Sequence, residues 1–133
     1  MTLLFQVHSA LRFVVLLVGL TMVAMCFAGL MQKQPFTRGA RVVGAVFSGA
    51  LQLQVLLGLG LLAMWPWVPR NIGHVVMMLA AVVLAMVMLR KNRKAAQPNW
   101  VRPLIGVGGA LALVAAGILA IGRMPWGITA FAG

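Results

Sequence analysis

The chain has 133 residues, of which 63% are hydrophobic and only 8% are charged. Soluble globular domains carry about 25% charged residues, so this composition excludes a water-soluble fold and predicts an integral membrane protein. Every charged side chain is basic, because the chain has eleven Lys and Arg residues and no Asp or Glu. The counterions must therefore come from lipid phosphates, a partner subunit or an anionic cofactor.

The side chains that are missing exclude several kinds of chemistry. Without Asp or Glu the chain has no carboxylate pair for acid–base catalysis and no acidic proton relay. Its single cysteine, Cys26, cannot form an intrachain disulfide, and there is no Cys/His cluster for zinc. The cations are grouped in short segments between apolar runs, which favours attraction to anionic lipids over binding to nucleic acid. We therefore expect neither an enzyme nor a soluble substrate.

Four apolar runs predict four transmembrane helices, at about residues 3–31, 42–64, 72–89 and 104–122. Each run reaches or approaches the roughly 17–25 residues that cross about 30 Å of hydrocarbon. The first run is longer than the apolar part of a secretory signal, about 7–15 residues, and no Lys or Arg precedes it, so we interpret it as a retained helix. Short connections make consecutive helices antiparallel neighbours. The expected fold is all-α, a single domain over residues 1–133 with an up-down-up-down four-helix bundle.

The cations predict the orientation of this bundle. The first and third connections, with their flanks, hold eight of the eleven: Lys33, Arg38, Arg41, Arg90, Lys91, Arg93, Lys94 and Arg102. The opposite side has only Arg70 and Arg123. The positive-inside rule places the two basic connections in the cytoplasm and both termini on the non-cytoplasmic side, in a bacterial inner or intracytoplasmic membrane. The four tryptophans fall at predicted interfaces, where indoles anchor helix ends: Trp65, Trp67, Trp100 and Trp126.

Small and polar residues mark candidate contact faces. Ala40, just before helix 42–64, and Gly44 and Ser48 within it are spaced four residues apart, so they share one face of the helix. Helix 104–122 contains several glycines. Such residues allow close approach of sibling helices, another subunit or a flat pigment. Gln52 and Gln54 point about 200° apart, so only one can face the bundle interior. Lipid or partner contacts are expected at Arg12, Gly44, Ser48, Gln52, Gln54 and Trp126. The similar endings Met64-Trp65-Pro66-Trp67 and Met124-Pro125-Trp126 suggest two copies of one helical hairpin.

The chain has two histidines, His8 and His74, and both are expected at the same membrane face and at similar depth. In a square bundle the first and third helices lie on a diagonal of roughly 11–14 Å, which leaves room for a haem iron between two imidazoles. Arg12, one turn from His8, could then pair with a propionate; the alternatives are lipid phosphates, helix carbonyls or a partner carboxylate. The histidines could also contact (bacterio)chlorophyll or carotenoid singly, or serve only as interfacial residues.

Four segments carry a resemblance: His8-Ser9-x-x-Arg12, Pro35-Phe36-Thr37, the run from Gln52 to Leu59, and His74 at the start of the third helix. Together they resemble small bacterial four-helix membrane proteins described as cytochrome-b-like. The chain departs from that pattern at Gln52, where an acidic residue is expected, in Gly73-His74-Val75, where Glu-His-Pro is expected, and at Met86, where a histidine is expected.

The leading interpretation is an accessory, non-catalytic subunit of a larger bacterial energy-converting complex, photosynthetic or respiratory, whose acids neutralise its cations. The alternative is a small b-type cytochrome with His8 and His74 as haem ligands and Arg12 beside a propionate.

Overall fold

A computed structural model, which describes residues 2–64 and 70–122, shows an all-helical protein. Helix α1 spans Thr2–Met31, α2 spans Arg38–Met64, α3 spans Arg70–Lys94 and α4 spans Val101–Ala120. Each is long and apolar enough to cross a membrane, as the sequence predicts. Large apolar side chains such as Leu17, Leu56 and Val83 are more than half exposed, which suits contact with lipid tails. The fold therefore defines the class: a multi-pass membrane protein.

Local capping and polar helix ends explain why three helices begin or end outside the apolar runs. Helix α2 begins before Val42 because Thr37 Oγ1 accepts a hydrogen bond from the Ala40 backbone N–H, 3.1 Å away. Helix α4 begins before Leu104 because Asn99 Oδ1 accepts one from the Arg102 N–H at 3.0 Å. Helix α3 continues through the cationic segment 90–94, which hydropathy alone does not identify as helical.

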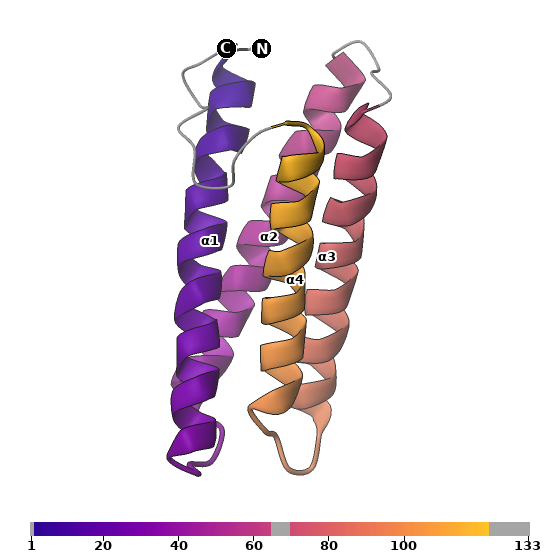
Figure 1. The fold of residues 1–133 in the computed structure, drawn as a ribbon. Helices are drawn as coiled ribbons and strands as arrows, with labels where there is room; N and C mark the ends of the chain where they lie inside the picture. Colours follow the sequence, from indigo (N-terminus) through magenta and orange to yellow (C-terminus); the bar gives the residue numbers. More distant parts are fainter. Residues whose placement is uncertain (1, 65–69, 123–133) are drawn as a thin grey trace.

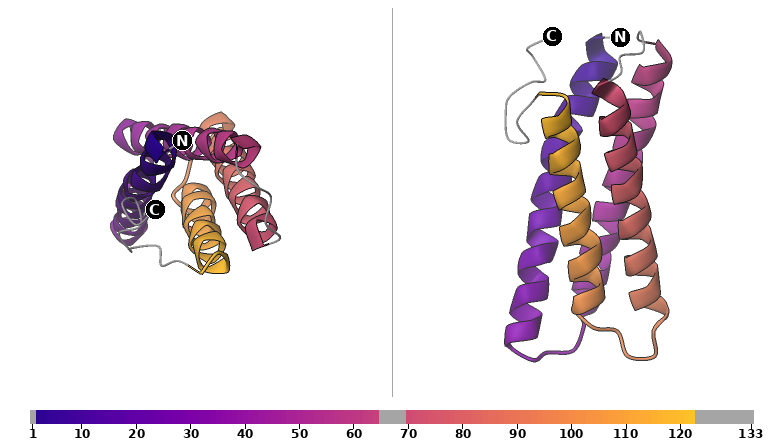
Figure 2. Two further views of the ribbon diagram at one scale, coloured as in Figure 1. Left: turned by 90° about the horizontal axis from the view of Figure 1, so that it is seen from above. Right: turned by 45° about the vertical axis from the view of Figure 1, so that its right-hand side comes forward.

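Within the described residues, α1 and α3 each contact both α2 and α4, as in the expected four-membered bundle, but the bundle is distorted because α2 is tilted (Figures 1 and 2). Helix α4 lies between α1 and α3, and α2 crosses behind them, leaning from α1 towards α3 (Figures 1 and 2). Helix α4 packs closely on α3 and also on α1, whereas the backbones of α1 and α3 do not come into contact within the described residues. The two helices that carry the histidines are therefore separated, as expected.

Helices α3 and α4 approach each other closely because glycines of α4 face α3. A Cβ atom built on Gly106 would lie 2.8 Å from Met88 Cβ, and one on Gly109 would lie 2.6 Å from Leu84 Cδ2. On α2, Gly44 is buried against Leu89 and Met22. At these positions the close approach is between helices of the same chain.

Replacing Gly106 with alanine is expected to destabilise the bundle by about 1–3 kcal/mol, because Met88 Cβ cannot move without moving the α3 backbone. The matched control is Gly108→Ala, since a Cβ at Gly108 meets nothing within 4 Å. The control should leave stability unchanged or slightly raised, owing to the better helix propensity of alanine. Unfolding of both variants by SDS in mixed micelles, followed by far-UV circular dichroism, makes the comparison. Equal stabilities would contradict the packing argument.

Trp100 joins the two connections at the end of the bundle where the cations gather. Its indole Nε1 donates a hydrogen bond to the Gln34 carbonyl at 2.8 Å, and its ring meets Phe36 edge-on at 4.8 Å. The ring lies against Gly29, where any Cβ would overlap it, and the side chain is only 6% exposed. Trp100 was expected to anchor a helix end in lipid headgroups, but it is instead buried between segments 32–37 and 95–100. The other three tryptophans, Trp65, Trp67 and Trp126, lie outside the described residues.

Candidate functional site

A cavity of about 370 Å³ opens between the helices at the end of the bundle opposite Trp100. All four helices line it, with α1 and α3 contributing their first turns and α2 and α4 their last (Figure 1). Most of the wall is apolar. The polar side chains on it are His8, Ser9, Arg12, Gln54, Asn71 and His74. The structure thus brings the two histidines and Arg12 together, whereas Gln52 lies elsewhere.

His74 is held in a defined orientation by helix α4. Its Nδ1 lies 2.9 Å from the Gly117 carbonyl oxygen. Because a carbonyl can only accept a hydrogen bond, Nδ1 must carry the proton, and the neutral ring then has its lone pair on Nε2. A Cβ on Gly117 would lie 3.5 Å from Nδ1 and 3.1 Å from Met77 Cβ, so glycine allows this close seating.

His8 is seated on α2 in a similar way. A Cβ on Gly58 would lie 3.0 Å from His8 Cε1, so the imidazole rests directly on the glycine. The backbone of Gln54 lies beside the ring, although the buried Nδ1 makes no well-formed hydrogen bond to any described residue. His8 also interacts electrostatically with His74 and Arg12, which agrees with their position on the same cavity.

The two histidines occupy corresponding positions in the two hairpins. In each hairpin the first helix carries a histidine near its start, and the second helix carries the glycine on which that histidine rests: His8 with Gly58, and His74 with Gly117. The sequence contained a signal for this pairing, because each glycine lies a few residues before the similar helix endings. The close packing of each imidazole on a glycine was nevertheless not predicted. Apart from Met64, both of those endings lie outside the described residues.

Arg12 is the most unusual member of the site. Its side chain is only 6% exposed, lines the cavity and has its guanidinium carbon 4.6 Å from the centre of the Phe13 ring. No acidic side chain of this protein can neutralise it, since the chain has none. Gln54 Oε1, also in the wall, is buried and accepts no hydrogen bond from a described residue. The cavity therefore presents positive charge and unused polar atoms to whatever occupies it.

The donor set of the cavity distinguishes between kinds of metal site. Among the described residues there is no group of three or more His, Cys, Asp or Glu that could hold a metal ion. Two imidazoles alone do not supply the four protein ligands of a structural zinc site. Two imidazoles could serve a haem, whose porphyrin provides four nitrogens of its own. In number of protein ligands, these side chains suit a haem better than a bare metal ion.

The remaining candidate contact residues divide between the inside and the outside of the bundle. Gly44 and Gln54, both suggested as lipid or partner contacts, are buried, Gly44 within the bundle and Gln54 in the cavity wall. Gln52 is exposed and donates a hydrogen bond from Nε2 to Ser48 Oγ, 3.0 Å away on the same helix. This division agrees with the 200° separation of Gln52 and Gln54. Trp126 lies outside the described residues.

No family model matches the chain, and neither the curated proteins nor the solved structures include one that is detectably similar to it. Its assignment therefore rests on its own residues.

Proposed function

We propose that this protein is a small b-type cytochrome of the bacterial inner membrane, with His8 and His74 as the two axial ligands of one haem. The single observation that carries the proposal is that both histidines of the chain line the same cavity, each seated on a glycine of the neighbouring helix. This is the alternative that the sequence left open, and the geometry favours it over a purely structural role.

The chain's own residues would hold the haem through three kinds of contact. The hydrogen bond to the Gly117 carbonyl would fix the His74 tautomer in which Nε2 carries the lone pair needed for ligation. Val15, Leu51 and Val114 contribute to an apolar wall that limits access of water. When bound, haem would supply reversible one-electron transfer, with a potential set by its axial ligands and by the polarity around it. The protein itself would act as an electron carrier and catalyse no reaction of its own.

Arg12 would neutralise one carboxylate of the haem. Arg12 lines the cavity and is only 6% exposed, and a hydrogen bond from a guanidinium to a carboxylate is among the stronger ones in proteins. A propionate of a haem bound in this cavity would therefore meet a positive charge there. The same bond would fix the orientation of the porphyrin edge.

The proposed orientation in the membrane is an up-down-up-down bundle with the Trp100 end in the cytoplasm and both termini on the other side. The distribution of cations supports it, because eight of eleven belong to the connections or helix ends at the Trp100 end. The haem would then lie towards the non-cytoplasmic face.

A reduced-minus-oxidised absorbance spectrum of the purified full-length chain, expressed with haem available, tests the proposal. A sharp α band with about one haem per chain is expected. A colourless protein with the same circular dichroism spectrum would refute haem binding.

Gly58→Ala is expected to weaken haem binding about tenfold, because the new methyl group would displace the His8 ring on which it impinges. Gly49→Ala is the matched control on the same helix, since a Cβ there meets nothing within 4 Å. Haem titration of the two apoproteins measures the difference. Identical affinities would show that His8 does not depend on its glycine seat.

The second candidate function is the accessory, non-catalytic subunit of a larger photosynthetic or respiratory complex, in contact with subunits, lipids or a (bacterio)chlorophyll or carotenoid. One observation favours it: the half-buried Ser48 and the exposed Gln52 form a polar spot on α2, where lipid offers no hydrogen bonds. Isolation in mild detergent distinguishes the two functions. A colourless chain that copurifies with other membrane subunits would support the accessory role.

A further inference from the structure

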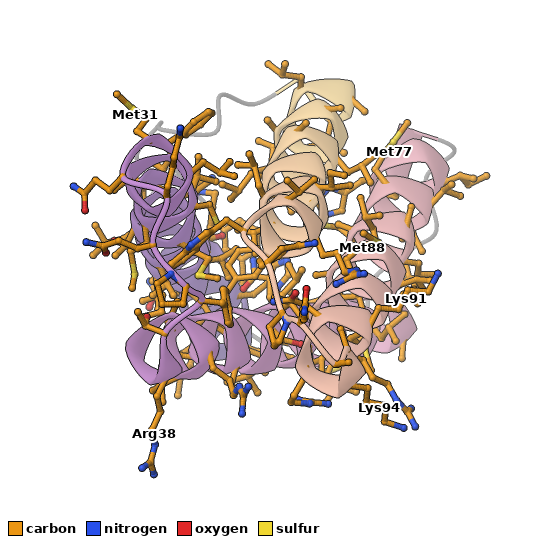
Figure 3. All side chains as sticks on the ribbon, turned by 90° about the horizontal axis from the view of Figure 1, so that it is seen from below. Met31, Arg38, Met77, Met88, Lys91 and Lys94 are labelled. Atoms are coloured by element: carbon orange, nitrogen blue, oxygen red, sulfur yellow. The ribbon has the colours of Figure 1, made fainter. Side chains whose placement is uncertain are left out.

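A second hollow lies at the opposite end of the protein from the histidines, between the end of α3 and the start of α4. It is an open groove lined by Arg90, Lys91, Lys94 and Arg102 together with Val87 and Ala95. Figure 3 views this end and labels Lys91 and Lys94 on α3. Four cations from two helices therefore converge on one concave surface, and the chain has no acidic side chain to pair with any of them.

The backbone around this groove is held in place by partly buried hydrogen bonds. Asn92, which is 1% exposed, accepts a hydrogen bond at Oδ1 from the Asn99 N–H at 2.8 Å. Asn99 in turn accepts one at Oδ1 from the Arg102 N–H at 3.0 Å. The close packing of Gly106 on Met88 brings the two helices together just beyond the groove. Arg102 is thus fixed relative to the cations of α3 rather than carried on a free loop.

The guanidinium of Arg102 indicates what kind of ligand the groove could bind. Its Nη1 atom is buried and has no hydrogen-bond partner among the described residues. A buried guanidinium N–H without an acceptor is costly, and phosphate oxygens match the guanidinium fork in geometry and charge. The groove combines this unused donor with three further cations.

We propose that this groove binds one phosphate group, that of an anionic lipid headgroup. The apolar surroundings favour a lipid over a soluble phosphate. Val87 forms part of the groove and is 42% exposed, and Val83, one turn further into the membrane span, is 59% exposed. On α4, Val101 and Ile105 are also about half exposed. An acyl chain could follow these side chains while its phosphate remains among the cations. This proposal is independent of haem.

Native mass spectrometry of the full chain, released from detergent micelles, tests the site with defined probes: dioleoyl phosphatidylglycerol, dioleoyl phosphatidylcholine and inorganic phosphate. The groove variant combines Arg90→Gln, Lys94→Gln and Arg102→Gln. The control combines Lys33→Gln, Arg38→Gln and Arg41→Gln, which removes the same charge from the other basic segment; Arg38 lies across this end of the bundle from Lys91 and Lys94 (Figure 3). Circular dichroism confirms that both variants remain folded.

The unaltered protein should retain one phosphatidylglycerol, in preference to phosphatidylcholine. The groove variant should bind it at least tenfold more weakly, and the control variant should bind it normally. If the two variants lose phosphatidylglycerol binding equally, binding depends only on the overall surface charge, and the proposed site is refuted. Full retention by the groove variant would also overturn it. If inorganic phosphate binds the groove as tightly as the lipid does, the phosphate site stands and the lipid assignment fails.

Discussion

Replacing His74 with alanine is expected to abolish the α band of the reduced protein, because one of the two proposed haem ligands is removed and no other described histidine but His8 lies on the cavity. His8→Ala should have the same result. The spectrum is measured at equal protein concentration after expression with haem available. Loss of the band from both variants, with helicity unchanged, would identify the two imidazoles as ligands.

Two controls separate loss of a ligand from loss of the fold. Adding free imidazole to His74→Ala should restore much of the α band, since the small ring can occupy the space that the substitution creates. Met78→Leu removes the thioether one turn beyond His74, in the same cavity wall, and should leave the band intact. If Met78→Leu abolishes the band while His8→Ala retains it, the ligand pair is His74 and Met78, and the assignment of His8 is wrong.

Replacing Trp100 with alanine is expected to lower the free energy of unfolding by about 3 kcal/mol, the lower end of the usual range for removing a buried tryptophan. The substitution empties the space against Gly29 and also removes the hydrogen bond to the Gln34 carbonyl. The measurement is SDS-induced unfolding in mixed micelles, followed by far-UV circular dichroism. The α band should be unaffected, because the cavity lined by His8 and His74 lies at the other end of the bundle.

The conservative change Trp100→Phe distinguishes packing from hydrogen bonding. It retains an aromatic ring beside Phe36 but has no indole N–H, so the expected loss is smaller, about 1–2 kcal/mol. A Trp100→Ala variant as stable as the original protein would show that the two connections are held together without the indole.

The number and approximate position of the helices could be predicted, because a helix that crosses a membrane needs a long apolar run. The ends of the helices could not be predicted, because they depend on hydrogen bonds to capping side chains, which hydropathy does not detect. Thr37 caps α2 five residues before the apolar run, and Asn99 fixes the start of α4. Trp100 was interpreted as a lipid anchor because its position along the chain matches an interface. Its burial depends on Gly29, which is 71 residues away in sequence and gives no local signal.

The site was only partly predictable. The shared depth of His8 and His74 was predicted from helix geometry and topology, and both side chains line one cavity. The spacing of Gln52 and Gln54 could not decide which of the two is buried, because it shows only that the two side chains point in different directions. The contact of each imidazole with a glycine could not be predicted without knowing how α2 and α4 are rotated about their axes. That rotation is set by packing along the whole helix.

The arrangement of each histidine on a glycine of its own hairpin has a consequence for biogenesis. His8 takes its orientation from α2, and His74 takes its orientation from α4, so neither ring needs the other half of the chain to be in place. The first hairpin can enter the bilayer with its half of the pocket complete while the second is still being translated. A haem bound as proposed would then be captured when the two halves dock, and it would itself help to join them.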